Sequence, residues 1–195
     1  MSWLPSALSW YFYLLGIGCL FYPLTKRIFR LLPFDHAYAF SKIIGILAIT
    51  YIAFFSSTYH LAVFSRPNLL FFLAGGGILN FFLVRKSLSR QKLTAYSSLF
   101  QLIIIEEVLF LAAFLAWTYV RGQEPAIHGL EKFMDYGFIN SILRSRYFPP
   151  IDMWLSSTTA AGLPINYYYF GHLTGALLIK LTAVLPAAGY NLLLA

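Results

Sequence analysis

Five long apolar segments are the feature that most constrains the fold of this 195-residue chain. A helix needs roughly 17–25 apolar residues to cross the hydrocarbon core of a bilayer. A spanning segment must also satisfy its own backbone hydrogen bonds, which leaves helices as the natural solution. The sequence therefore predicts an all-α, polytopic transmembrane helical bundle of about five spans, at residues 8–24, 43–64, 69–84, 99–120 and 173–195.

The composition agrees with this class. The chain is 59% hydrophobic and only 11% charged, whereas about a quarter of the residues in an ordinary soluble domain are charged. The net charge is +7, but the basic residues form short clusters between apolar runs. We therefore expect a lipid bilayer as the main partner and no nucleic acid. The single cysteine, Cys19, can form no internal disulfide.

The basic clusters also predict the orientation of the spans. Cytoplasmic loops carry an excess of Lys and Arg. Segments 25–42 and 85–98 are rich in basic residues, whereas the turn between the second and third spans contains only one, Arg66. We therefore expect a multi-pass protein of the plasma membrane with its N-terminus and segment 121–172 outside. The predicted organisation is four spans in residues 1–120, an external loop at 121–172 and a fifth span at 173–195. The inside clusters contain Lys26, Arg27, Arg30 and Lys42, and Arg85, Lys86, Arg90 and Lys92.

An amphipathic helix is predicted at residues 131–145 of the external loop. Met134, Phe138 and Ile142 recur with the period of a helix, so this helix should lie along the membrane interface. Pro149-Pro150 should stop it. Glu131 and Asp135 are four residues apart and would share one face. They are candidate functional carboxylates or simply part of a solvated face.

The rest of the loop is rich in aromatic and polar residues. Asp152 and Trp154 follow the proline pair, and the tyrosine run 167–169 and His172 come just before the fifth span. A run of tyrosines at a membrane boundary most often anchors the chain, and a lone histidine is most often a packed one. No second His or Cys stands at metal-site spacing, so the sequence predicts no zinc site.

Two carboxylates fall inside the fourth span. Charged residues within a span are costly and are usually functional, so Glu106 and Glu107 are candidates for a proton or ion relay, with Lys180 in the fifth span. The alternative is that both lie near the cytoplasmic interface. The relay would make the protein a transporter or channel-like component.

The motifs of the second half resemble a known family. Four motifs occur in the order EKFMD, N-x-I-L-R-S, FPP-x-D-x-W and INYYYFGH. They resemble motifs of the YYY-type multipass membrane proteins of bacteria and archaea, a family that was first described as of unknown function. The resemblance covers about residues 100–195, and residues 1–98 match only as hydrophobic spans. That family in turn resembles the GT-C membrane glycosyltransferases. The chain would then be the N-terminal part of a GT-C-like fold.

The resemblance implies an activity and roles for residues. The expected reaction is transfer of a sugar from a polyprenyl-phosphate donor to an acceptor at the outer face. Asp135 and Glu131 would be catalytic, and a divalent metal, where one is needed, would use Asp135 with Asp152 or Glu131. A third reading is a non-catalytic membrane assembly subunit. The residues expected to bind substrate or lipid phosphate are Arg144, Asp152, Trp154, Tyr167, Tyr168, Tyr169 and His172.

Overall fold

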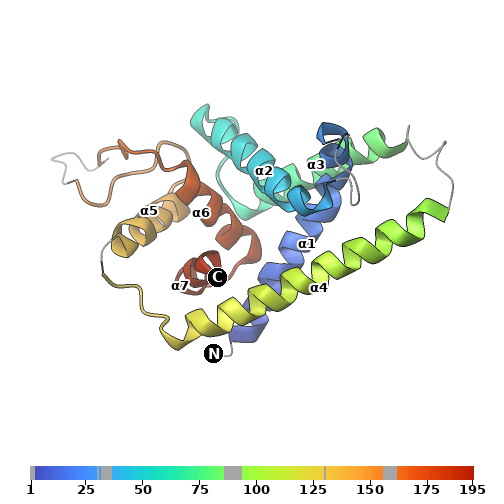
Figure 1. Cartoon of the computed structure of the whole chain (residues 1–195). Coiled ribbons are helices and arrows are strands. Elements are labelled where there is room, and N and C mark those ends of the chain that lie inside the picture. Colours follow the sequence, from blue (N-terminus) through green and yellow to red (C-terminus); the bar gives the residue numbers. More distant parts are fainter. Residues whose placement is uncertain (1–2, 30, 32–36, 86–93, 130, 156–161) are drawn as a thin grey trace.

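The computed structural model describes residues 3–29, 31, 37–85, 94–129, 131–155 and 162–195. These residues form seven α-helices and one short 3-10 helix, which confirms the all-α prediction (Figure 1). Lys86, Arg90 and Lys92 of the predicted basic loop, and the spacer 156–161, lie outside the described residues. The helices are α1 (Trp3–Ile28), α2 (Ser41–Thr58), α3 (Arg66–Arg85), α4 (Thr94–Gln123), α5 (Lys132–Arg144), α6 (Phe170–Thr182) and α7 (Pro186–Leu194), and the 3-10 helix η1 is Tyr38–Phe40.

Three of these segments are long and apolar enough to cross a membrane, judged over the described residues. They are Trp3–Ile28, Tyr38–Thr58 and Leu99–Gln123, which correspond to the first, second and fourth predicted spans. The third predicted span falls within α3. The number of candidate membrane spans among the described residues is therefore smaller than the five expected from the sequence.

The prediction of one fifth span at 173–195 is wrong. The chain forms α6 of 13 residues and α7 of 9 residues instead, and each is too short to cross a bilayer alone. Ala183 ends α6 in the left-handed conformation, with φ 57°. Pro186 then begins α7, and Leu185 before it is extended, as the residue before a proline prefers to be. The break follows from Pro186, which cannot continue a helix.

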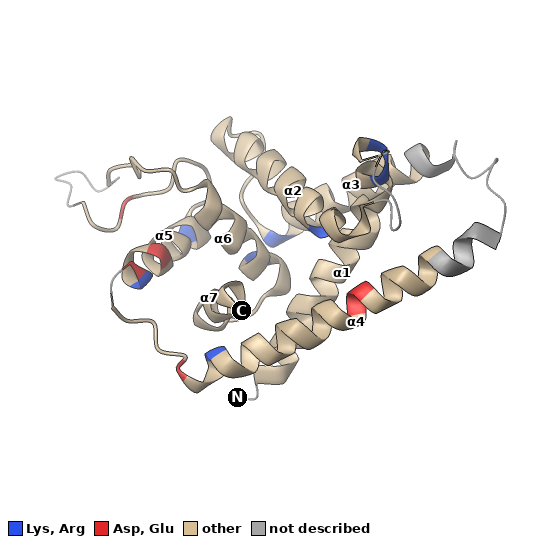
Figure 2. Cartoon of the chain, viewed as in Figure 1, with Lys and Arg blue, Asp and Glu red and all other residues tan. Residues whose placement is uncertain are grey.

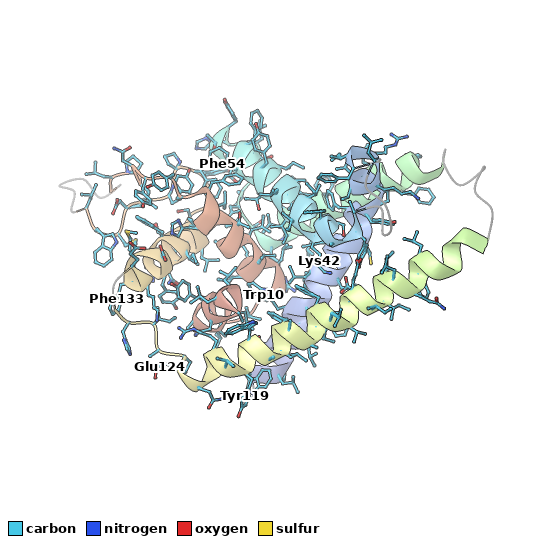
Figure 3. All side chains as sticks on the ribbon, viewed as in Figure 1. Trp10, Lys42, Phe54, Tyr119, Glu124 and Phe133 are labelled. Carbon is cyan, nitrogen blue, oxygen red and sulfur yellow. The ribbon has the colours of Figure 1, made fainter. Side chains whose placement is uncertain are left out.

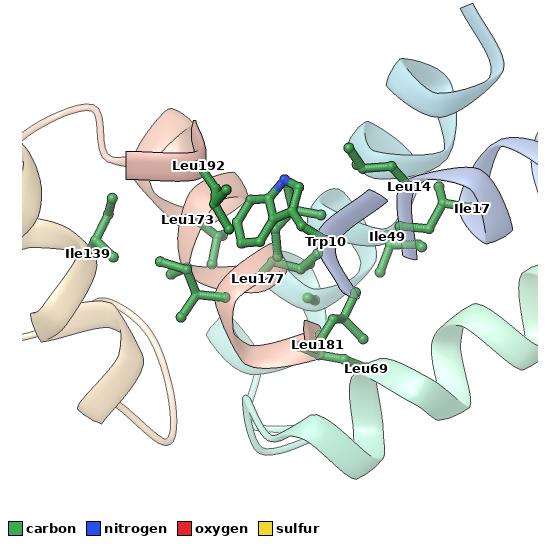
Figure 4. Packing of buried hydrophobic residues seen from close by; sticks show 14 of the residues in the cluster. Trp10, Leu14, Ile17, Ile49, Leu69, Ile139, Leu173, Leu177, Leu181 and Leu192 are labelled. Carbon is green, nitrogen blue, oxygen red and sulfur yellow. The ribbon is translucent and has the colours of Figure 1, made fainter. Parts of the chain in front are cut away.

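Helix α1 is the centre of the bundle and contacts α2, α3, α4, α6 and α7. Its residue Trp10 is 2% exposed and packs beside leucines of α6 and α7, whereas Leu14 and Ile17 face Ile49 of α2 (Figure 4). One continuous apolar core therefore joins the long helices to the short ones. Burial of these side chains is the main force that holds α6 and α7 in place.

A glycine allows the closest approach of α1 and α2. A Cβ atom built on Gly45 would lie 2.4 Å from Cγ2 of Ile17 and 2.9 Å from Cδ2 of Phe21. Both side chains are buried, so neither can move away freely. The absence of a side chain at Gly45 therefore sets the distance between these two helices.

Segments far apart in the sequence meet at two places in the bundle. Phe64 donates its backbone N–H to the carbonyl of Arg146, and Phe148 donates to the carbonyl of Ser57. The rings of Trp3 and Tyr119 lie 6.5 Å apart. The turn after α2 therefore lies beside the segment that follows α5, and the start of α1 lies beside the end of α4.

Helices α5 and α6 run parallel to each other. Asp135 and His172 meet near their first turns, and the ammonium of Lys180 donates to the carbonyl of Leu143 near their last turns. The apolar face of α5 is buried, with Phe138 4%, Ile139 3% and Ile142 0% exposed. The predicted helix at 131–145 is confirmed, with α5 ending at Arg144 before the proline pair. Its apolar side packs on protein.

Candidate functional site

Asp135 and His172 form the one acid–imidazole contact that is partly buried among the described residues. Nε2 of His172 lies 2.9 Å from Oδ1 of Asp135, and the two side chains are 17% and 36% exposed. The residues are 37 positions apart in sequence. Parallel packing of α5 on α6 brings them together, and the sequence reasoning had placed both in the site.

The hydrogen bond defines the roles of the two imidazole nitrogens. An ionised carboxylate only accepts hydrogen bonds, so Nε2 of a neutral His172 donates to Asp135. The other nitrogen, Nδ1, is buried and has no hydrogen-bond partner among the described residues. The carboxylate of Asp135 is therefore partly exposed, and the hydrogen bond fixes the orientation of the imidazole.

An aromatic row extends from this pair. The ring of Phe138 lies edge-on to His172 at 5.2 Å and stacks on Tyr167 at 5.5 Å, and Tyr167 stacks on Tyr168 at 4.1 Å. Tyr168 is 81% exposed. Such a row offers flat apolar faces beside the carboxylate, which suits the stacking of a sugar ring.

Tyr169 has a different environment from its two neighbours. Its ring lies 6.2 Å from those of Phe54 and Phe148, and burial raises the pKa of its phenol. The hydrogen bond with Tyr168 raises the pKa of Tyr167, and the charges of Glu131 and Asp135 add to that effect. The tyrosine run is therefore divided, because Tyr167 is close to the carboxylates and Tyr169 packs against α2.

Glu131 and Arg144 lie at opposite ends of α5. Glu131 is the exposed N-cap residue, on the same side as Asp135. Arg144 is nine residues from Asp135, which is about two and a half turns of a helix and places it on the opposite face. It lines an open groove of about 860 Å³ with Asn140, Ser141 and others. The structure does not bring Arg144 to the Asp135–His172 pair.

Asp152 and Trp154 form a local turn. Oδ1 of Asp152 accepts the backbone N–H of Trp154 at 2.8 Å and of Leu155 at 3.3 Å, and the Trp154 side chain is 62% exposed. Such a turn is a common structural use of aspartate. Among the described residues, no group of three or more His, Cys, Asp or Glu could hold a metal ion, so Asp135 and Asp152 do not share such a cluster.

The two carboxylates of the fourth span are not equivalent. Glu107 is 9% exposed and pairs with Lys42. It also accepts the hydroxyls of Tyr11 at 3.0 Å and Tyr38 at 2.7 Å. Figure 2 shows the acidic colour midway along α4, in a helix that is otherwise almost free of charge. Glu106 lines a cavity of about 270 Å³ beside this cluster. The full set of donors on Glu107 favours a structural role.

Lys180, the other charged residue of the rival transport reading, also makes structural contacts. Its ammonium donates to the carbonyls of Phe64 at 2.8 Å and Leu143 at 3.0 Å, and lies 4.2 Å from the centre of the Phe64 ring. It joins the end of α6 to the turn after α2 and to α5.

Tyr190, near the candidate site, was not predicted from the sequence. Tyr190 of α7 is 3% exposed and its ring lies 5.6 Å from that of Tyr136. Burial raises the pKa of Tyr190, the charge of Asp135 raises it further and that of Arg121 acts in the opposite direction. The motifs quoted above do not include Tyr190, so they gave no signal for it.

The helices, their apolar surfaces and the motifs define the class of this protein. It is an integral membrane protein with about three spans among its described residues and a helical lobe at one end. Residues 48–195 match the family described as "Uncharacterized membrane protein (DUF2298)", and the chain belongs to that family. No curated protein and no solved structure matches the chain.

Proposed function

We propose that this protein is a membrane glycosyltransferase of GT-C type, which transfers a sugar from a polyprenyl-phosphate donor at the outer face of the membrane. The observation that carries the proposal is the contact between Asp135 and His172. Both residues belong to the motifs on which the resemblance rests. Their convergence supports a single site made of α5 and α6.

Asp135 is the general base in this proposal. A carboxylate can accept the proton of an acceptor hydroxyl as the oxygen attacks the sugar carbon, and the polyprenyl phosphate leaves. The 36% exposure of Asp135 leaves it accessible to an acceptor. His172 acts as a positioning residue, because its Nε2–H fixes the carboxylate.

The surroundings favour an anionic leaving group. Asp135 lies in the first turn of α5 and His172 in the first turn of α6, and the two helices are parallel. Their N-terminal ends, which carry partial positive charge, are therefore adjacent. Tyr167 and Tyr168 provide stacking faces for a sugar. Glu131 is a secondary acid on the same side, and Arg144 and Asp152 lie outside this arrangement.

The experiment compares two acid–histidine pairs of the same segment. Membranes containing equal amounts of each variant receive polyprenyl-phosphate glucose or polyprenyl-phosphate mannose with a radiolabelled sugar. Asp135→Asn should lower the transfer rate by about 10²–10⁴-fold, the usual cost of losing a general base. Glu124→Gln is the control, because Glu124 is 72% exposed and contacts the 70% exposed His128 at 3.7 Å.

The outcomes separate the proposal from its rivals. Equal transfer by Asp135→Asn and the parent protein would contradict the proposal. His172→Gln should lower the rate less than Asp135→Asn and shift its pH profile, because it changes the environment of the base. Loss of activity in Glu124→Gln as large as in Asp135→Asn would show that the assay reports damage to the segment and not chemistry.

A further inference from the structure

The open groove that Arg144 lines is a second candidate site, separate from Asp135 and His172. It lies between α5 and the segment that follows this helix, and it has a volume of about 860 Å³. Two arginines, Arg144 and Arg146, and two apolar side chains, Ile151 and Met153, are among its lining residues. The groove therefore combines positive charge with apolar surface.

The segment after α5 is held against the helix, so the groove is a built feature. The hydroxyl of Ser141 donates to the carbonyl of Ile151. The end of the Met153 side chain rests on Gly137, where a Cβ atom would collide with it. Side chains of α5 and of the following segment therefore keep a fixed relation across the groove.

The two arginines have no ionic partner in the part of the chain that the structure describes. Both side chains are exposed, and neither guanidinium makes a hydrogen bond or an ion pair with the described residues. The nearest acid in sequence, Asp152, turns Oδ1 to the backbone N–H groups of Trp154 and Leu155. Because arginine stays charged and its planar fork matches a phosphate, the pair favours an anionic ligand.

The backbone at the end of α5 does not repel an anion there. Unpaired carbonyls give the C-terminus of a helix a partial negative charge. Here the carbonyls of Ser141 and Ile142 accept the backbone N–H of Ser145, and that of Leu143 accepts the ammonium of Lys180 at 3.0 Å. These three carbonyls are thus paired, and Lys180 adds a positive charge to this end of the helix.

The groove lies beside the end of a candidate membrane span. That span, Tyr38–Thr58, ends two residues before His60, and the His60 ring lies 4.5 Å from the ring of Tyr147, which lines the groove. Phe54 of α2, labelled in Figure 3, has its ring 6.3 Å from that of Phe148. The groove is therefore placed where a lipid headgroup would begin.

The apolar side chains of the groove distinguish a lipid from a soluble anion. Ile151 is 50% exposed and Met153 is 39% exposed. Trp154 and Leu155, which follow in the sequence, are exposed as well. A soluble anion would leave this surface in water, whereas an acyl chain would cover it.

We propose that this groove binds one anionic phospholipid of the bilayer, with its phosphate on Arg144 and Arg146 and an acyl chain on Ile151 and Met153. The proposal does not rest on sugar transfer, because Arg144 is on the face of α5 opposite to Asp135. A sugar donor with its phosphate in this groove would be on the wrong side of the helix for the base.

Native mass spectrometry of the delipidated protein in detergent tests the proposal. One phosphatidylglycerol should bind more tightly than any further copy. Phosphatidylcholine should bind about 10-fold or more weakly, because its choline places a positive charge beside the two arginines. Soluble glycerol phosphate at the same concentration should not displace phosphatidylglycerol, because it lacks the acyl chains.

Variants locate the site on the groove. Arg144→Gln and Arg146→Gln should each weaken phosphatidylglycerol binding about 3-fold or more, and the double variant about 10-fold or more. Ile151→Ser should weaken it about 3-fold or more through the lost apolar contact. Lys132→Gln is the matched control, because it removes the same charge from the opposite end of α5 and does not line the groove.

Each contrary result has a definite meaning. Equal binding of the two phospholipids, or unchanged binding in the double arginine variant, overturns the proposal. Displacement by glycerol phosphate would show a soluble phosphate ligand, and tighter binding of polyprenyl phosphate would show a sugar carrier; either overturns the phospholipid assignment. An equal loss in Lys132→Gln would show that net charge alone attracts the lipid and would overturn the assignment to the groove.

Discussion

At the scale of single residues, the ion pair of Glu107 and Lys42 is the most demanding feature of the bundle. Both side chains are nearly buried, at 11% and 12% exposure. Two tyrosine hydroxyls complete the acceptor sites of Glu107, and the ring of Phe110 lies 4.5 Å from the Lys42 nitrogen. Because a buried charge is tolerated only when it is paired, each partner depends on the other.

Removal of one partner should therefore cost more than removal of both. Lys42→Met should lower the free energy of unfolding by about 3–5 kcal/mol, because it leaves the Glu107 carboxylate unpaired in an apolar setting. The double variant Lys42→Met with Glu107→Gln should recover a large part of this loss. Unfolding in a detergent titration measures both. A double variant less stable than Lys42→Met would contradict the structural role.

At the scale of elements, the spacing of α1 and α2 depends on Gly45. An alanine there places its Cβ 2.4 Å from Ile17, and overpacking of this kind costs about 1–3 kcal/mol. Gly45→Ala should lower the thermal midpoint in detergent. Gly16→Ala is the matched control in α1, because nothing lies within 4 Å of its Cβ and alanine favours a helix. Equal midpoints for the two variants would show that α1 and α2 are less closely packed.

The elements also show how far sequence reasoning extends. The period of Met134, Phe138 and Ile142 was sufficient to predict α5, since the pattern is local. The break between α6 and α7 was missed, although Pro186 offered a signal. The partners of Glu107 had none, because Tyr11 is 96 residues away in sequence. Pairing of Asp135 with His172 likewise required the parallel arrangement of two helices.

At the scale of the whole molecule, the ends of the bundle carry different regions of the chain. The turn after α2 and the segment 146–148 are hydrogen-bonded to each other, so they must be on one side of the membrane. The last turn of α1, with Lys26 and Arg27, lies at the other end. From the positive-inside rule we expect that end to be cytoplasmic.

Single cysteines in a Cys19→Ser background test this orientation. Leu61→Cys and His128→Cys should react with a membrane-impermeant maleimide in intact cells, because both native residues are exposed and belong to the predicted outer end. Arg27→Cys should react only after the cells are permeabilised. Labelling of position 27 in intact cells, or protection of positions 61 and 128, would reverse the assignment.

The exposure of α4 has a consequence for how its sequence can vary. Only 11% of its apolar window is buried, and the buried side chains Glu107, Phe114 and Thr118 form one narrow stripe. Elsewhere, as at Leu109 or Trp117, the helix needs only a residue that dissolves in lipid. A saturation-mutagenesis screen should therefore find that nearly any apolar residue is accepted on the outer face. Only the few buried positions of α4 then require a particular side chain. At the remaining positions the sequence has only to keep the helix soluble in the hydrocarbon of the bilayer.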